Sequence, residues 1–130
     1  MKHPERAEDY LEHIAQAIER AIAYVKPFGG VEGLQQNQQA QDAVIRNIEI
    51  IGGAANRIQQ HAPEFVAAHP ELPWIEMRGM RNKMIHNYFD VSLTIVWNTI
   101  KNDLPSLKQR IDDSQIDRQR GGFGEHDRSQ

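Results

Sequence analysis

The chain has 130 residues, no cysteine, 39% hydrophobic and 25% charged residues, and a formal charge of −3. This length predicts one domain, and the lack of cysteine excludes a disulfide framework, a cysteine nucleophile and a cysteine-based zinc site. The charged start and the broken apolar stretches argue against a signal peptide and a membrane span, so we expect a cytoplasmic protein without membrane contact. The acidic balance argues against a broad nucleic-acid-coating surface, so any polyanion site is expected to be local.

The first helix is expected over residues 4–26, because apolar residues recur there at steps of three and four. A glycine-rich break follows, and a second helix carries its apolar stripe over residues 44–58. Gly52 and Gly53 lie inside this stripe. Because glycine weakens a helix by about 1 kcal/mol relative to alanine, the pair indicates close approach of another backbone.

Three prolines then punctuate a loop over residues 62–72, with room for a single turn of helix. A third helix is expected over residues 73–90, and a fourth helix follows Asp90 as its N-cap. Asp103, with a proline two residues later, is typical of a new N-cap and first turn. Residues 104–111 are therefore expected to form a kinked or separate helix.

These segments predict an all-α fold, an up-and-down four-helix bundle with an extra C-terminal helix. The folded domain is expected to span residues 1–116. Residues 117–130 are polar and contain glycine, so we expect a disordered tail there. The apolar content is enough for a modest core only, which favours burial of further surface against a second copy of the chain.

The one concentrated basic patch lies in residues 74–88, where Arg78, Arg81 and Lys83 accompany a single acidic residue. The same segment contains His86. Histidine titrates near neutral pH and can move a proton, and arginine can hold a phosphate through two hydrogen bonds. RNA carries its own nucleophile, the 2′-hydroxyl, so a general base and a charge clamp would suffice for strand cleavage without a metal.

On a continuous helix, Arg78, Asn82 and His86 would form one polar row, and Arg81 and Tyr88 would share a neighbouring face. Arg81 and His86 would then converge only on a ligand in a groove, or through the copies in a symmetry mate. From the residues alone a second interpretation stays open. Arg81 and His86 would be solvated surface residues, and Tyr88 would pack against the core.

No metal or cofactor site is predicted. His13, His61 and His69 lack the spacing to Asp or Glu partners that a metal site requires. Trp74 and Trp97 lie in apolar stripes and are expected to be core or dimer contacts.

The segment Arg81-Asn82-Lys83-Met84-Ile85-His86-Asn87-Tyr88 resembles the signature of the HepT-like toxins of the HEPN superfamily. That signature is arginine, four residues, histidine, one residue and tyrosine, commonly with Asn or Asp after the arginine. The resemblance also takes in residues 42–55 and 88–91 and extends over about residues 10–111. It implies a helical homodimer in which two motifs face each other across a shared cleft, acting as a metal-independent endoribonuclease without a cofactor.

The resemblance also implies roles for single residues. His86 would be the proton-transfer residue, Arg81 the contact to the phosphate and the transition state, and Asn82 a supporting polar group. Arg78 and Lys83 are candidates for further phosphate contacts.

In similar toxins the tyrosine of the motif, here Tyr88, receives AMP from a partner nucleotidyltransferase antitoxin of the MNT type. AMP there would add bulk and negative charge where the RNA phosphate must bind. The expected function is thus a ribonuclease toxin, with RNA, a second copy of the chain and the antitoxin as partners. The alternative is a catalytically weak bundle that serves as the nucleotide-binding or docking subunit of a nucleotidyltransferase complex.

One departure from the family's pattern lies in the second helix. Many relatives carry a glutamate where this chain has Gly53. If that carboxylate orients a catalytic group, activity here depends on a substitute. Glu49, one helical turn earlier, is a candidate, although its direction does not follow from the sequence.

Overall fold

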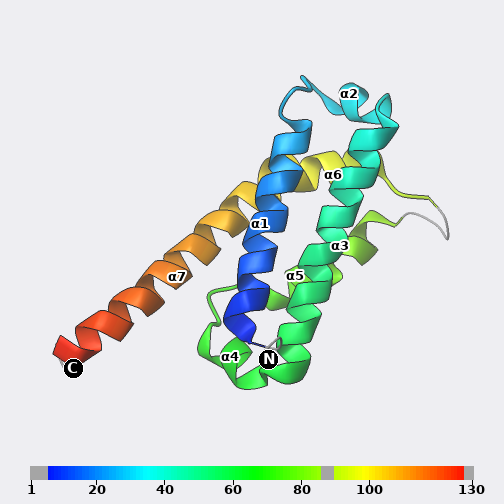
Figure 1. Ribbon diagram of the computed structural model, residues 1–130. Helices are drawn as coiled ribbons and strands as arrows, with labels where there is room; N and C mark the ends of the chain where they lie inside the picture. The colour runs from blue at the N-terminus through cyan, green and yellow to red at the C-terminus, as the bar shows by residue number, and fades with distance from the viewer. Residues whose placement is uncertain (1–5, 86–89, 128–130) are drawn as a thin grey trace.

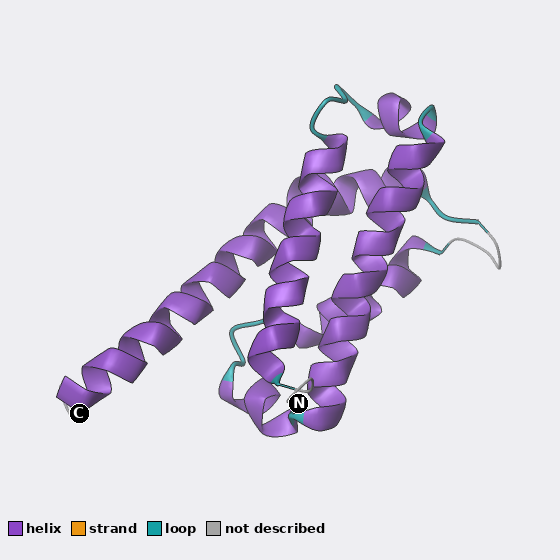
Figure 2. Ribbon diagram, viewed as in Figure 1, coloured by secondary structure: helices purple, strands orange, loops and turns teal. Residues whose placement is uncertain are grey.

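The structure is a computed structural model that describes residues 6–85 and 90–127, with the backbone alone for residues 116–127. Within these ranges the chain forms helices and no strand, and one isolated antiparallel bridge joins Ile85 to Val91 (Figure 2). The predicted all-α fold is confirmed. None of the described helices is long and apolar enough to cross a membrane.

The helices follow one another along the chain, and α1 packs on α3 and α7 while α3 packs on α5 (Figure 1). Their bounds are α1 Ala7–Val25, α2 Val31–Gln35, α3 Gln38–His61, α4 Pro63–Ala68, α5 Trp74–Met84, α6 Leu93–Asn98, the π-helix η1 Thr99–Asp103, and α7 Leu104–Asp127. The first two long helices correspond to the predicted ones. The short α2 lies in the stretch that we expected to be a glycine-rich break.

The core is formed where the apolar stripes of the long helices meet. The stripe predicted for the second helix is buried in α3, which confirms the three- and four-residue periodicity. The largest fully buried side chains come from all parts of the bundle: Leu11, Ile14, Ile18, Leu34, Ile48, Ile51, Ile58, Met77, Met84, Ile100, Leu104 and Ile111. Trp74 is also buried within the chain, as expected for a core residue.

The boundary between the third and fourth helices differs from the prediction. We expected one helix over residues 73–90 and Asp90 as the next N-cap. Instead, α5 ends at Met84, and Ile85 has an extended backbone with φ −79° and ψ 118°. α6 begins after Ser92, whose hydroxyl accepts a backbone N–H of the first turn at 3.3 Å. Serine is a strong N-cap for this reason, so the predicted cap at Asp90 is wrong.

The last two predicted helices are joined, not separate. α6, η1 and α7 follow one another directly, and the N–H of Leu104 donates to the carbonyl of Thr99. Pro105 has no N–H with which to continue the ordinary helical ladder, and a π-turn directly precedes it. Asp103 is the last residue of η1, so the prediction that it caps a separate helix is wrong.

α7 is helical to Asp127 and so continues past residue 116, the predicted end of the folded domain. Leu107 and Ile111 in its first half are buried in the core. Figure 1 shows the rest of α7 extending away from the bundle. The division into a folded domain over 1–116 and a disordered tail over 117–130 stays a prediction.

A polar cluster ties the connection between α4 and α5 to α7. The Ser114 hydroxyl donates to Oε2 of Glu71 at 3.0 Å and lies 3.2 Å from Nδ1 of His69, which is itself 3.0 Å from the same carboxylate oxygen. The indole N–H of Trp74 donates to the backbone carbonyl of His69 at 2.9 Å. The cluster therefore fixes where α5 begins, and α5 carries Arg81.

The charge of Glu71 is expected to stabilise this cluster in a pH-dependent way. Burial disfavours the charged form, but hydrogen bonds from the Glu71 backbone, from His69 and from Ser114 outweigh it and hold the pKa of Glu71 below its ordinary value of 4.5. A carboxyl group with a lowered pKa in the folded state adds stability above its unfolded pKa, and this stability is lost as the pH falls through the folded value. We expect Glu71→Gln to lower the urea midpoint at neutral pH.

The difference in stability should shrink as the pH falls below 4.5 and through the lower folded-state pKa of Glu71, because the wild-type carboxyl group then becomes protonated as well. Urea unfolding of both proteins at matched concentration over a series of pH values would measure the difference. A constant difference between pH 3 and pH 7 would show that the charge of Glu71 does not contribute.

Candidate functional site

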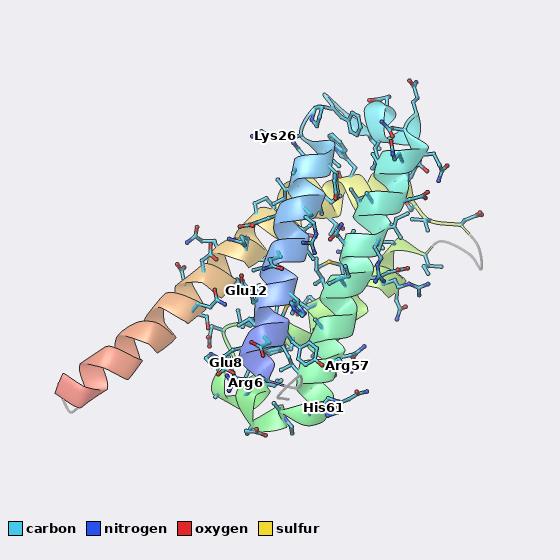
Figure 3. All side chains as sticks on the ribbon, in the orientation of Figure 1. Arg6, Glu8, Glu12, Lys26, Arg57 and His61 are labelled. Carbon is cyan, nitrogen blue, oxygen red and sulfur yellow. The ribbon has the colours of Figure 1, made fainter. Side chains whose placement is uncertain are left out.

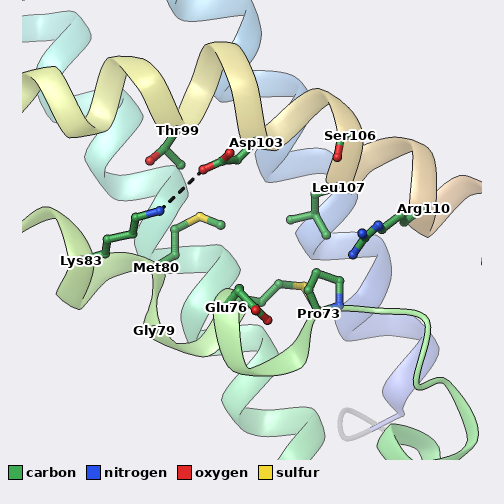
Figure 4. Close-up of a pocket in the computed structure, with 11 residues that line it drawn as sticks. Pro73, Glu76, Gly79, Met80, Lys83, Thr99, Asp103, Ser106, Leu107 and Arg110 are labelled. Carbon is green, nitrogen blue, oxygen red and sulfur yellow. Dashed lines mark ion pairs between the residues drawn. The ribbon is translucent and has the colours of Figure 1, made fainter.

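The cations of α5 point to different sides of the helix. Successive helical residues are about 100° apart, so Arg81 and Lys83 lie on nearly opposite faces. Nε of Arg81 donates to Oε2 of Glu49 on α3 at 3.2 Å. Nζ of Lys83 lies 3.7 Å from Oδ2 of Asp103 in η1 (Figure 4). The structure therefore separates two cations that are neighbours in the sequence.

Arg81 is held but not buried. Its side chain is 51% exposed, and that of Glu49 is 35% exposed. The contact to Glu49 uses the Nε–H, which is one of five guanidinium donors. Within the described part of the chain, the donors on the two Nη atoms have no hydrogen-bond acceptor. Arg81 can therefore bind an anion through its Nη edge while Glu49 holds the Nε edge.

The direction of Glu49, which the sequence left open, is towards Arg81. Gly53 is exposed, and a Cβ added there would meet no heavy atom within 4 Å. α3 therefore presents a carboxylate to α5 from Glu49, one helical turn before Gly53.

The close approach predicted from the glycine pair occurs at Gly52. A Cβ added at Gly52 would lie 3.4 Å from the carbonyl oxygen of Met77 and 3.6 Å from that of Arg78. α3 therefore runs close to the backbone of α5 at this point. Glu49 and Arg81 each lie about one turn away from it along their own helices. The prediction is confirmed for Gly52 and wrong for Gly53, which faces open space.

The other polar residues of the patch do not gather around Arg81. The side chain of Arg78 lines a hollow with Gln59 and Trp74, and its buried Nε has no hydrogen-bond partner among the described residues. Asn82 is exposed in the last turn of α5.

Residues 86–89, which include the histidine and the tyrosine of the motif, lie outside the described residues. The chain on either side of them is fixed. The N–H of Ser92 donates to the carbonyl of Met84 at 2.8 Å, and Ile85 is bridged to Val91. The carbonyl of Met84 is an acceptor that a longer α5 would use for itself, so this contact accounts for the end of the helix.

The predicted row of Arg78, Asn82 and His86 along one helix is wrong, because α5 ends before His86. The motif instead crosses a helix end. Arg81 lies in the last turn of α5, and His86 directly follows the extended residue Ile85.

A pocket of about 430 Å³ lies beside α5, against η1 and α7 (Figure 4). Two cations, Lys83 and Arg110, and two carboxylates, Glu76 and Asp103, are among its lining residues, and Arg81 is not. The charges balance, and Lys83 is already paired with Asp103. This pocket therefore lacks the concentrated positive charge that a phosphate backbone would require.

The end of the bundle where α1 begins and α3 ends also carries both signs of charge. Figure 3 labels Arg6 and Glu8 at the start of α1 and Arg57 and His61 in the last turns of α3, with Glu12 further along α1. Within the described parts of the chain, no group of three His, Asp or Glu side chains could hold a metal ion. Among the described residues of α5, the arginine that combines an exposed donor edge with a fixed orientation is thus Arg81.

Comparison with known proteins agrees with this site. Residues 14–113 match the family described as Ribonuclease HepT-like. A relative from Thermococcus cleftensis, named "Probable ribonuclease HepT", is 43% identical over 104 residues, which are 80% of this chain and 91% of the relative. A relative from Caldanaerobacter subterraneus, named "Putative RNase", is 38% identical over 102 residues, 78% of this chain and 88% of the relative. No solved structure matches the chain.

An all-α bundle with an arginine-histidine motif at a helix end defines the class of the protein. The chain belongs to the HepT-like ribonuclease family. The resemblance inferred from the motif is therefore confirmed.

The two adjacent glycines of α3 are expected to respond in opposite ways to substitution. Gly53→Ala should raise the free energy of unfolding by about 0.5–1 kcal/mol, because alanine favours the helix and its Cβ meets open space. Gly52→Val should lower it by about 1–3 kcal/mol, because the γ-methyl groups would reach the backbone of α5. Urea unfolding at matched concentration measures both, and similar values for the two variants would contradict the close contact at Gly52.

Proposed function

We propose that the chain is a metal-independent endoribonuclease, the toxin of a toxin–antitoxin pair. Membership of a ribonuclease family supports RNA as the substrate. The observation that carries the proposal is the state of Arg81: its Nε is bound by Glu49, its other donors are free among the described residues, and it stands five residues before His86.

In the proposed reaction His86 takes the proton of an RNA 2′-hydroxyl. The 2′-oxygen then forms a bond to the adjacent phosphorus, the bond from phosphorus to the 5′-oxygen breaks, and the departing 5′-oxygen receives a proton. The products are a 2′,3′-cyclic phosphate and a 5′-hydroxyl end. Arg81 binds the phosphate oxygens and stabilises the added negative charge of the transition state.

The remaining polar residues of the patch would have smaller roles. Asn82 is exposed next to Arg81 and would offer a supporting hydrogen bond. Lys83 is paired with Asp103 on the other side of α5, so it would act on an outlying phosphate, as would Arg78. The proposed unit is a cytoplasmic homodimer whose two motifs face a shared cleft. The dimer would bring two motif arginines and two motif histidines to one RNA strand.

His86→Ala is expected to abolish RNA cleavage in EDTA, because the proton acceptor is lost while α5 and its Arg81 remain. Cleavage of total cellular RNA by purified protein, at matched concentration and confirmed dimer mass, measures the loss. His13→Ala is the matched control, since His13 is an exposed histidine on α1. Cleavage by His86→Ala at the wild-type rate would remove His86 from the mechanism.

If the unmodified wild-type protein does not cleave RNA, the alternative function gains support. The bundle would then be a catalytically weak nucleotide-binding or docking subunit of a nucleotidyltransferase complex. Mass spectrometry must first exclude a modified tyrosine in the sample.

We further propose that an MNT-type nucleotidyltransferase antitoxin neutralises the protein by attaching AMP to Tyr88. The phenol oxygen attacks the α-phosphorus of ATP, the bond to pyrophosphate breaks, and the phenol proton is released. The tyrosine lies two residues after His86, so the AMP phosphate would place negative charge beside the donor edge of Arg81. The RNA phosphate would then meet a repulsive charge and an occupied arginine.

Coexpression with such a nucleotidyltransferase is expected to raise the intact mass by one or more AMP units and to stop cleavage. Tyr88→Phe should prevent the first addition, because phenylalanine has no hydroxyl. Tyr24→Phe is the matched control, because Tyr24 is 41% exposed on α1 and offers a second accessible phenol. AMP addition to Tyr88→Phe but not to Tyr24→Phe would contradict the proposal, because it would show that Tyr24 is the modified residue.

A further inference from the structure

We propose that Glu49 is a positioning residue that holds Arg81 for the transition state of RNA cleavage. The proposal rests on the ribonuclease function proposed above and adds to it a residue outside the motif. It begins from the hydrogen bond between Nε of Arg81 and Oε2 of Glu49 at 3.2 Å, which joins side chains 32 positions apart in the sequence.

The contact fixes the direction of the arginine. The guanidinium group is planar, so a bond at Nε determines where the opposite Nη edge points. Two parallel hydrogen bonds to a phosphate come from a guanidinium edge, so an arginine free to turn would offer that edge only part of the time. The exposed side chain of Arg81 has no other partner among the described residues that could orient it.

Both partners stand on rigid elements. Glu49 follows Ile48 and precedes Ile51 by two positions, and both isoleucines are fully buried in the core. The close contact of Gly52 with the backbone of α5 sets the separation of the two helices one turn away. Functional side chains on well-packed helices are held more accurately than those on loops. The position of the Glu49 carboxylate is therefore set by the core of the bundle.

The sign of the Glu49 charge separates positioning from binding. A carboxylate beside the phosphate site repels RNA in the ground state, so it cannot help by tightening substrate binding. It can help by keeping the donor edge in place when negative charge builds up on the phosphate. Loss of Glu49 should therefore lower kcat, while KM and the affinity for an uncleavable RNA stay the same or improve.

The first test is Glu49→Gln, which keeps the length of the side chain and removes its charge. We expect kcat in EDTA to fall about ten- to hundredfold, the range that small misplacements of a catalytic group produce. The affinity for an oligonucleotide with 2′-O-methyl groups, which cannot be cleaved, should be unchanged or tighter. Glu49→Ala, whose side chain accepts no hydrogen bond, completes the test: an unchanged kcat in this variant would overturn the proposal, and so would a rise in KM that accounts for the whole loss.

Glu19→Gln is the matched control. The Glu19 carboxylate lies 3.1 Å from Nζ of Lys108, so the substitution removes the same charge from an ion pair between α1 and α7, and Asp112 remains as the second partner of Lys108. It should leave kcat, KM and RNA affinity unchanged. If kcat falls as much in this variant as in Glu49→Gln, the cause is net charge or general stability. That result would overturn the proposal.

A second measurement does not depend on activity. In ¹⁵N NMR, the Nε–H signal of Arg81, identified by its absence in Arg81→Lys, should exchange slowly with water in the wild type and faster in Glu49→Ala, which removes the acceptor. Fast exchange in both proteins would overturn the positioning role. If the signal behaves as expected but the wild type does not cleave RNA, the ribonuclease proposal fails and the orientation of Arg81 by Glu49 stands by itself.

Discussion

The close contact between α3 and α5 at Gly52 is the feature on which the rest of the site depends. A Cβ at this position would already be in van der Waals contact with the carbonyls of Met77 and Arg78, so a branched or longer side chain would push the two helices apart. Glu49 and Arg81 meet because they lie about one turn from this contact on their respective helices. An absent side chain in the core thus controls the orientation of an exposed one.

The sequence predicted the helices that their own apolar periodicity defines, and it failed where a partner elsewhere in the chain decides the outcome. The stripe of α3 is buried as expected. α5, by contrast, ends at Met84 because the N–H of Ser92 takes the carbonyl there, a contact that no property of residues 73–90 indicates. The π-turn could have been predicted from the sequence, because Pro105 lacks the N–H that an ordinary helical turn needs.

The candidate site, like the fold, could be predicted from the sequence only in part. The motif identified Arg81 from residue types and spacing, and the angle of about 100° per residue already places Lys83 on another face. The role of Glu49 could not be read in advance, because the direction of a side chain on α3 relative to α5 depends on how the two helices are rotated about their axes. That rotation is set jointly by all the buried residues of the pair.

On the proposed mechanism, a chain with a formal charge of −3 does not need a broad basic surface to act on RNA. An arginine partly neutralised by a carboxylate attracts the substrate less than a free arginine would. The same carboxylate keeps the donor edge directed where charge increases during the reaction, and only interactions that strengthen in the transition state accelerate the chemical step. Weak ground-state attraction and a fixed orientation therefore follow from one ion pair. The arrangement also makes the site sensitive to a single added phosphate, because a competing anion beside Arg81 meets a donor edge that is already oriented to bind it.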